Sequence, residues 1–437
     1  MNALVVGQEV RMVQGGAVLR IESREAEGSQ GIVYRATMAD KTPVAVKWIK
    51  DNPEIERQRR SIAELTRRPR PHPAYSWPID IVAADGVAGF GYVMPWVSPK
   101  RFVTLTEVLE KPPPLRTIAA IGRDLADAFS KLHALGLCYR DINFGNLRVD
   151  PVGVEVAIVD NDNVGVLGGD VFVLGTMRFM APEVIRGEAE PSIESDLHSL
   201  AVFLFYLLVH SHPLEGAKVH GSYTWRTDGH VSETDVVVRG FGREPLFIFD
   251  PADHSNAPIP GDPATLWWPI YPRFVHELFE RAFGPGLKDS AAGSRVVESE
   301  WRKAMLRLGD SVDACRCGAA VLYDADDPTR ACWHCANRGT PPLVLDVRQR
   351  RIVLAEGAVL TRDLVFSDRR YRDVLGAVEA HPRDPGKVVL HNLTEESWSA
   401  HPLGEEVLEI PPDRRFAVRP GALTIGAVDT VIRVAPG

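Results

Sequence analysis

The chain has 437 residues, a formal net charge of −8 and 45% hydrophobic residues. This length exceeds one average domain, and the apolar fraction can fill more than one core, so we expect two to four domains. The negative charge argues against a dedicated nucleic-acid binder. The longest apolar stretch, residues 200–209, is about half of the ~20 residues that a membrane span needs. The N-terminus lacks a signal-peptide pattern, so we expect a soluble, cytoplasmic protein.

A strand is predicted at residues 17–21, followed by a turn that contains glycine and by a second strand. Gly28 and Gly31 lie in the turn, and Val33 begins the second strand. Residues without side chains let backbone amides approach phosphate groups, and an apolar residue such as Val33 covers a base. The pattern G-x-G-x-x-G is incomplete because Ala26 stands at its first position, so the segment alone favours an ordinary hairpin turn.

Two further apolar strands follow. The first, residues 44–47, has the sequence Val-Ala-Val-Lys and ends on Lys47. A lysine in an apolar strand just after the glycine turn favours a functional role over a surface position. The second strand ends near Met94, Pro95 and Val97. A proline there is compatible with the end of an edge strand.

Residues 139–146, with the sequence YRDINFGN, place an acid and an amide at a fixed separation, Asp141 and Asn146. An apolar strand then delivers a second acid, Asp160. Such groups accept a hydroxyl proton and hold magnesium in phosphoryl transfer. A single Asp-x4-Asn is more simply a loop or a helix cap, so the neighbouring motifs decide between the two interpretations.

Residues 175–183, with the sequence GTMRFMAPE, form the most specific motif after residues 139–146. Asp196 then opens an apolar segment whose all-round hydrophobicity predicts a helix buried on every side. Arg295 follows about a hundred residues later, shortly before another segment that reads as a helix.

In this order the segments resemble Ser/Thr protein kinases over residues 18–308. The resemblance implies an α+β, bilobal protein-kinase fold, with an N-lobe at 18–98 after a leader at 1–17 and a C-lobe at 99–310. It implies an ATP- and magnesium-dependent enzyme that transfers the γ-phosphate to Ser or Thr of a protein. Small-molecule phosphotransferases lack the Ala-Pro-Glu segment and the glycine loop, which favours a protein substrate.

The resemblance also implies the role of each residue. Lys47 would hold the α and β phosphates and pair with Glu64 of the next helix, Glu56 being the alternative. Met94 would be the gatekeeper, and the Pro95 carbonyl and the Val97 amide would bind adenine. The expected catalytic residues are Asp141, Lys47, Asn146, Asp160 and Glu64; the ATP-binding residues Gly28, Gly31, Val33, Ala45, Lys47, Met94, Pro95 and Val97; the magnesium ligands Asn146 and Asp160; and the structural residues Glu183, Arg295 and Asp196.

Four departures from the family pattern matter. Tyr139 replaces the catalytic-loop histidine. Asn143 stands where Ser/Thr kinases place a lysine on the γ-phosphate, so a charge-assisted contact is missing. If nothing replaces this lysine, transfer slows roughly ten- to a hundredfold without being abolished. Asp-Phe-Gly becomes Asp-Asn-Asp, whose last residue, Asp162, is either a second metal ligand or a solvated acid. Residues 163–174 contain no Ser, Thr or Tyr, so Arg140 has no loop phosphate to bind and we expect activity without phosphorylation of this loop.

This set of variants, together with residues 246–256, Trp268 and residues 295–301, resembles one bacterial subgroup. Its members are the kinases of the tellurium-resistance-associated (TerY-type) triad, which accompany a von Willebrand A-type protein and a metal-dependent protein phosphatase. The resemblance implies those partners and a role in bacterial signalling or stress response, with no nucleic-acid or membrane partner.

Four cysteines gather in residues 311–339. Four thiolates in two close pairs suit a structural zinc ion in a zinc ribbon, with a hairpin between the pairs. A redox pair or disulfides are the alternatives, but no βαβ pattern surrounds the cysteines and the compartment is expected to be reducing. The expected zinc ligands are Cys315, Cys317, Cys332 and Cys335.

Residues 340–437 contain short alternating apolar runs separated by Gly, Pro and Asp, a pattern typical of a β-sandwich. Several of these runs resemble a forkhead-associated domain. Gly357 is followed by Ala358, and the family's phosphothreonine-binding set is not recognisable. We therefore expect a degenerate, protein-docking version of that domain.

A second hypothesis is a pseudokinase scaffold that recruits partners through its zinc ribbon and β-sandwich. Asn143, the altered metal loop and the segment without phosphorylatable residues favour it. The joint presence of Lys47, Asp141, Asn146 and Asp160 opposes it, because a scaffold has no physical need for all four.

Overall fold

The structure is a computed structural model that describes residues 3–28, 31–166, 169, 171, 174–224, 233–289, 293–325, 331–384 and 386–435. The chain forms two compact units. The first contains Met1–Pro113, Ile121–Thr265 and Glu277–Arg302, and the second contains Pro114–Ala120, Leu266–His276 and Lys303–Gly437. Among the described residues, no helix is both long enough and apolar enough to cross a membrane.

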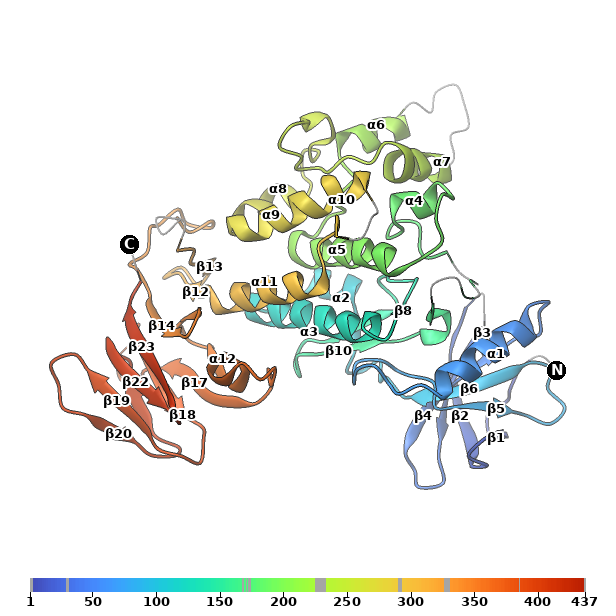
Figure 1. The fold of residues 1–437 in the computed structure, drawn as a ribbon, viewed down its shortest axis with the longest axis horizontal. Helices are drawn as coiled ribbons and strands as arrows, with labels where there is room; N and C mark the ends of the chain where they lie inside the picture. The colour runs from blue at the N-terminus through green and yellow to red at the C-terminus, as the bar shows by residue number, and fades with distance from the viewer. Residues whose placement is uncertain are drawn as a thin grey trace. The chain divides into compact units, whose positions relative to one another are not determined.

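The first unit begins with a closed antiparallel barrel of six strands in the order β1-β2-β3-β4-β6-β5 (Figure 1). Val44, Val46 and Trp48 of β4 point into its core. Ala45 and Ile49 lie on the other face of β4 and pack with Ile62 of the helix α1, so both faces of β4 are covered. The bounds are β1 (Glu9–Met12), β2 (Val18–Glu27), β3 (Gly31–Thr37), β4 (Pro43–Ile49), β5 (Asp80–Ala83), β6 (Phe90–Pro95) and α1 (Ile55–Thr66).

The expected leader at residues 1–17 is wrong for its central part. Residues 9–12 form β1, which pairs with β2 and β5 and closes the barrel. Val10 and Met12 are buried, while their neighbours Glu9 and Arg11 are exposed. This alternation is too short to be a strong sequence signal, because four residues fit a strand or a loop equally.

The rest of the first unit is mainly helical and is built around α5 (Ile193–Val209). Every residue of α5 from Ser195 to Val209 is buried, so the prediction of a helix buried on every side is confirmed. The other helices are α2 (Leu105–Glu110), α3 (Leu115–His133), α4 (Pro182–Ile185), α6 (Ala217–Thr224), α7 (Glu233–Val237), α8 (Ala264–Trp267), α9 (Arg273–Ala282), α10 (Pro285–Lys288) and α11 (Glu298–Asp310), with η2 (Val238–Arg243), η3 (His254–Asn256) and η4 (Trp268–Ile270). Of these, α3, α8, α9 and α11 are divided between the two units, and η4 belongs to the second unit.

Short strands flank the loops that lie between these helices. β10, β9 and β7 form one antiparallel sheet, and β11 pairs with β8. The turn η1 follows β10 directly. The bounds are β7 (Val103–Thr104), β8 (Leu137–Cys138), β9 (Leu147–Asp150), β10 (Glu155–Ile158), η1 (Asn161–Asn163) and β11 (Gly165–Val166).

In the second unit, a hairpin of β12 (Val312–Ala314) and β13 (Ala320–Leu322) precedes two antiparallel sheets. One sheet has the order β15-β14-β23-β22-β19-β20 and the other β16-β17-β18-β21, and residues of both share one core. This is the packing that the alternating apolar runs predict. The bounds are β14 (Leu343–Val347), β15 (Arg350–Val353), β16 (Val359–Thr361), α12 (Arg362–Phe366), β17 (Val374–Ala380), β18 (Val388–Asn392), β19 (Trp398–Pro402), β20 (Leu408–Ile410), β21 (Arg415–Ala417), β22 (Gly421–Ile425) and β23 (Val428–Val434).

The substitution Trp398→Ala tests this core. Trp398 is 1% exposed and its ring packs against Gly376, where a Cβ atom would stand 2.6 Å from the ring. We expect the variant to lower the free energy of unfolding by about 3–5 kcal/mol, measured by urea denaturation. The control Val431→Ala, at an exposed position of β23, should change it by less than about 0.5 kcal/mol. Equal losses in the two variants would contradict a shared core.

Candidate active site

A cavity of about 430 Å³ opens between the barrel and the loops after β8 and β10. Its walls come from β2, β3, β4 and β6 on one side and from residues 145–148 and 159–160 on the other. Ser29 and Gln30, in the glycine turn, lie outside the described residues. The structure brings all eight expected nucleotide-binding residues to this cavity, namely Gly28, Gly31, Val33, Ala45, Lys47, Met94, Pro95 and Val97, together with Asn146 and Asp160.

Ser76 is a cavity residue that the sequence did not single out. Its hydroxyl donates to the carbonyl oxygen of Pro95 at 2.7 Å, and its backbone N–H donates to the Ile158 carbonyl at 2.8 Å. Ser76 therefore ties the end of β6 to the end of β10. A carbonyl oxygen has two lone pairs, so Pro95 keeps one for a second donor. No local pattern signals this role, because it depends on which strands meet in space.

Lys47 carries a buried ammonium group between two carboxylates. Its Nζ atom donates to both carboxylate oxygens of Asp162, at 2.8 and 3.0 Å, and also to Asp160. Burial alone would lower the pKa of Lys47, but the charges of Asp162 and Asp160 outweigh it and raise that pKa. Lys47 therefore stays charged inside the protein.

The two carboxylates differ in their surroundings. The side chain of Asp160 is 31% exposed and lines the cavity, whereas that of Asp162 is 7% exposed and does not line it. Burial and the adjacent charge of Asp162 raise the pKa of Asp160. Burial opposes ionisation of Asp162 as well, but the charge of Lys47 lowers its pKa below the ordinary value. Asp162 is thus the permanent counter-ion of the pair.

The expected pair of Lys47 and Glu64 does not form. Glu64 is exposed on α1, whose buried residues are Ile62 and Leu65. The alternative, Glu56, is exposed as well. The physical reason is that Asp162 already supplies a carboxylate at hydrogen-bond distance, so the helix can turn its acidic side chains to solvent.

The loop of residues 139–146 is folded around its own side chains. The Nδ2 of Asn146 donates to the carboxylate and to the carbonyl of Asp141, each at 3.0 Å. Thr176 donates to the other carboxylate oxygen of Asp141 at 2.9 Å. Asp141 is therefore held from both sides, with its carboxylate partly exposed.

Asn143 shapes this loop, a role that was not among our predictions. Its Oδ1 accepts from the backbone N–H groups of Gly145 and Asn146 at 2.9 and 3.0 Å. Its Nδ2 donates to the Thr176 hydroxyl at 3.1 Å. Asn143 thus joins the loop to the start of the GTMRFMAPE segment. An asparagine that bonds the backbone two and three residues ahead is a common loop device, which is the signal available in the sequence.

The turn η1 is anchored by polar contacts. The Nδ2 of Asn161 donates to the carbonyls of Ser76 at 2.8 Å and Ile158 at 3.1 Å. The hydroxyl of the buried Tyr139 donates to the carbonyl of Val159. Asn161 and Tyr139 thus hold the backbone on both sides of Asp160.

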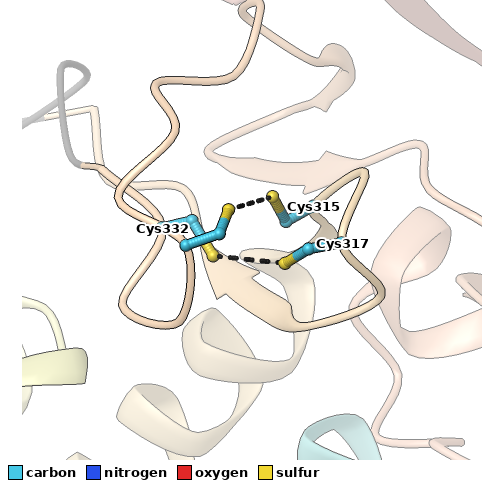
Figure 2. Close-up of side chains that lie close together, drawn as sticks. Cys315, Cys317 and Cys332 are labelled. Carbon is cyan, nitrogen blue, oxygen red and sulfur yellow. Dashed lines mark hydrogen bonds between the residues drawn. The ribbon is translucent and has the colours of Figure 1, made fainter.

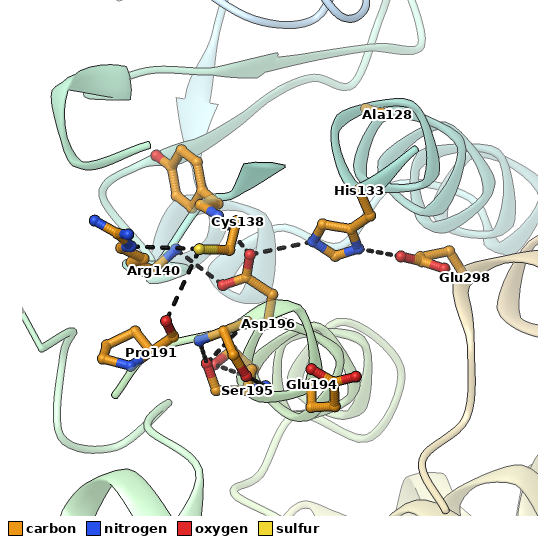
Figure 3. A network of polar contacts seen from close by, with 12 residues as sticks. Ala128, His133, Cys138, Arg140, Pro191, Glu194, Ser195, Asp196 and Glu298 are labelled. Carbon is orange, nitrogen blue, oxygen red and sulfur yellow. Dashed lines mark hydrogen bonds and ion pairs between the residues drawn. The ribbon is translucent and has the colours of Figure 1, made fainter. Parts of the chain in front are cut away.

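Arg140 is buried, and its guanidinium donates hydrogen bonds to other groups of the protein (Figure 3). Its Nη2 donates to the Val166 carbonyl at 2.8 Å, and its Nε donates to the sulfur of Cys138 at 3.3 Å. A Cβ atom at Gly165 would stand 2.8 Å from the guanidinium, so a larger residue there would displace the guanidinium from its contacts. Residues 167, 168, 170, 172 and 173 of the following segment lie outside the described residues.

Asp196, at the start of α5, holds the backbone before Asp141 (Figure 3). Its carboxylate accepts from the N–H groups of Tyr139 and Arg140, the latter at 2.9 Å. His133 contacts the same carboxylate at 3.1 Å and also contacts Glu298. The loop is thereby fixed to the most buried helix of the first unit.

Glu183 and Arg295 form the expected buried pair. Two parallel hydrogen bonds of 2.9 and 2.8 Å join the carboxylate and the guanidinium. Arg295 also donates to the carbonyls of Gly286 and Glu194, at 3.1 and 2.7 Å. Such a bidentate pair fixes the GTMRFMAPE segment geometrically as well as electrostatically.

The four clustered cysteines meet in the second unit (Figure 2). Their sulfur atoms lie within 4.8 Å of one another, with 3.6 Å between Cys315 and Cys335 and 3.7 Å between Cys317 and Cys332. Four thiolates at about 2.3 Å from one zinc ion stand about 3.8 Å apart, so the arrangement fits this metal. The hairpin β12–β13 does not join the two pairs as expected, because its turn carries the first pair, and residues 326–330 lie outside the described residues.

The pH dependence of stability tests the contact between His133 and Asp196. Burial would lower the pKa of His133, but Asp196 and Glu298 outweigh it and raise the pKa to about 9 from 6.5. The protonated ring therefore stabilises the fold fully below pH 6.5, and this contribution is lost as the pH rises through 9.

At about 1.4 kcal/mol per pKa unit, the free energy of unfolding should fall by about 3 kcal/mol between pH 6.5 and 9.5. Urea denaturation across this range measures it, and the variant His133→Gln should show a flatter profile. Parallel profiles in the two proteins would contradict the assignment.

Comparison with known proteins gives one family match. The model of the protein kinase domain matches residues 26–240. This match contains the cavity residues except Glu25, and also residues 139–146 and Glu183, whereas Arg295 lies beyond it.

Three bacterial relatives illustrate the similarity. The serine/threonine-protein kinase pkn3 of Myxococcus xanthus is 25% identical over 220 residues, 47% of this chain and 40% of that protein. PknL of Mycobacterium tuberculosis is 28% identical over 145 residues, 31% of this chain and 36% of that protein. RqkA of Deinococcus radiodurans, named a DNA damage-responsive serine/threonine-protein kinase, is 28% identical over 203 residues, 44% of this chain and 29% of that protein.

The matches thus span less than half the length of each of these relatives and less than half of this chain. The residues that line the cavity all lie in the first unit. Residues 26–240 match the protein kinase domain, and the relatives that match part of this chain are named serine/threonine-protein kinases.

Proposed function

We propose that the protein is an ATP- and magnesium-dependent protein kinase that transfers the γ-phosphate to Ser or Thr of a protein partner. The observation that carries the proposal is that Lys47, Asn146 and Asp160 line one cavity, and that Asp141 is hydrogen-bonded to Asn146 beside it. A cation, two oxygen ligands and a base within one site are the parts that phosphoryl transfer needs, because the reaction rests on positioning and charge neutralisation.

Each group has one task in this proposal. Lys47 neutralises phosphate oxygens, and the oxygens of Asn146 and Asp160 are the hard ligands that suit magnesium. Magnesium, when bound, would neutralise the charge of the phosphates. Asp141 accepts the proton of the substrate hydroxyl, and the hydrogen bond from Thr176 orients its carboxylate.

The other end of the cavity suits a nucleobase. Val33, Ala45 and Met94 provide apolar walls. The Pro95 carbonyl offers its remaining lone pair to the exocyclic amine of adenine, and the Val97 amide is the proposed donor to the ring. A cavity with apolar walls and few polar groups is the usual form of a small-molecule site.

We further propose that this kinase does not require phosphorylation of the segment after η1. Arg140, the residue that binds the activating phosphate in many kinases, is buried here and donates to the Val166 carbonyl and the Cys138 sulfur. Phosphorylation of Thr176 would remove the hydroxyl donor to Asp141 and place a dianion beside its carboxylate, so it would oppose catalysis.

The proposed partners follow from the resemblance to the tellurium-resistance-associated triad. They are a von Willebrand A-type protein as substrate and a metal-dependent protein phosphatase. The β-sandwich, as a degenerate forkhead-associated-like domain, would dock such a partner. The match to the protein kinase domain ends at residue 240, before this part of the chain.

The variant Asp141→Asn tests the kinase activity. We expect it to lower the rate of phosphate transfer by about 10²–10⁴-fold, because the amide cannot accept the proton. The assay follows labelled phosphate from ATP, with magnesium, to the von Willebrand A-type protein. The exposed control Asp85→Asn should keep the wild-type rate within about twofold. Equal labelling by wild type and Asp141→Asn, or no labelling by either, would instead favour the pseudokinase scaffold.

A structural zinc ion in the four-cysteine cluster is the second part of the proposal. With four protein ligands the site is closed, so the metal would fold the loops and take no part in chemistry. Elemental analysis should find about one zinc ion per chain, lost in Cys317→Ser and retained in Cys138→Ser. Wild-type protein without zinc, or an unchanged zinc content in Cys317→Ser, would contradict this assignment.

A further inference from the structure

We propose that Asp162 is the positioning residue for Lys47, in place of a glutamate on helix α1. This inference rests on the proposed kinase function. Both carboxylate oxygens of Asp162 accept from Nζ of Lys47, at 2.8 and 3.0 Å, and both side chains are more than nine-tenths buried. A buried ammonium needs a buried, hydrogen-bonded counter-ion, and Asp162 meets this need.

The location of Asp162 separates this role from the two alternatives of a metal ligand and a solvated acid. A solvated acid would be exposed, but Asp162 is 7% exposed. A metal ligand beside the nucleotide would line the cavity as Asp160 does, but Asp162 is not among the residues of its wall. Asp162 therefore stands behind Lys47, and Asp160 faces the cavity.

The backbone around Asp162 lies beside α1, but the hydrogen bonds that anchor it go to other segments. Asn161 binds the carbonyls of Ser76 and Ile158, which belong to the loop before β5 and to β10. Asp160 takes the left-handed backbone conformation, with φ of 60°, that directs the next residues inward. Polar anchors thus replace the apolar residue and the glycine that the family pattern places after the metal-binding acid.

A consequence for regulation follows. In a kinase whose lysine pairs with a helix glutamate, displacement of the helix uncouples the lysine and switches the enzyme off. Here the exposed Glu64 makes no contact with Lys47, and the turn that holds Lys47 belongs to the same segment as Asp160. Lys47 and Asp160 are therefore positioned together, and displacement of α1 does not release Lys47.

Kinetics separate positioning from a loss of fold. We expect Asp162→Asn to raise the KM for ATP at least about tenfold and to lower kcat/KM about 100-fold, because a misplaced lysine weakens nucleotide contacts. Asp162→Glu, which keeps the charge, should recover part of the loss. The matched control Glu64→Gln should stay within about twofold of wild type. A fall in kcat with unchanged KM, or an equal loss in Glu64→Gln, would overturn the proposal.

A thermal-stability cycle tests the contact without nucleotide or activity, so its failure is distinguishable from failure of the kinase proposal. Melting temperatures are compared for wild type, Asp162→Asn, Lys47→Met and the double variant. We expect Asp162→Asn to lower the melting temperature in the presence of Lys47 and to have a much smaller effect in the Lys47→Met background. Equal decreases in both backgrounds would show that Asp162 does not act on Lys47.

Discussion

The ammonium group of Lys47, buried under the barrel, is the constraint on which the site depends. An unpaired ammonium group there would destabilise the fold or lose its proton, because a buried ion without a partner costs several kcal/mol. Asp162 and Asp160 supply the compensation, and both lie on the turn after β10. The ion pairs of Lys47 with these two carboxylates therefore connect the barrel to the turn after β10. The same contact sets the distance between the cation for the phosphates and the carboxylate that faces the cavity.

The remaining contacts hold that turn and the neighbouring loop to a rigid base. Asp196, on the wholly buried α5, accepts from the backbone just before Asp141. Glu183 and Arg295 fix the segment that delivers Thr176 to Asp141. Rigid support of this kind suits phosphoryl transfer, in which catalysis rests on holding the reacting groups in place. These buried charges thus position the groups of the site more than they stabilise the fold, since the replacement of a buried ion pair by apolar residues often leaves stability unchanged.

The sequence predicted the site wherever a role is encoded by neighbouring residues. Gly31, Lys47, Met94, Asp141 and Asn146 lie in recognisable local patterns. The structure brings four of them to the walls of one cavity, and Asp141 is hydrogen-bonded to one of these four, Asn146. Pairings between distant segments were harder. Glu64 was chosen by its place in a helix, but the burial of Ile62 and Leu65 turns it to solvent. Asp162 remained ambiguous because its burial depends on tertiary packing. Ser76 gave no signal, and β1 was too short to be separated from a leader.

The most direct test of this account is an experimental structure of the chain with magnesium and a non-hydrolysable ATP analogue. The distances to compare are those from Nζ of Lys47 to the carboxylates of Asp162 and Glu64. The account predicts that Asp162 stays within hydrogen-bond distance, about 3 Å, while Asp160 turns to the metal and Glu64 remains in solvent. A structure in which Lys47 leaves Asp162 and pairs with Glu64 would contradict the claim that the turn after β10 positions the catalytic lysine.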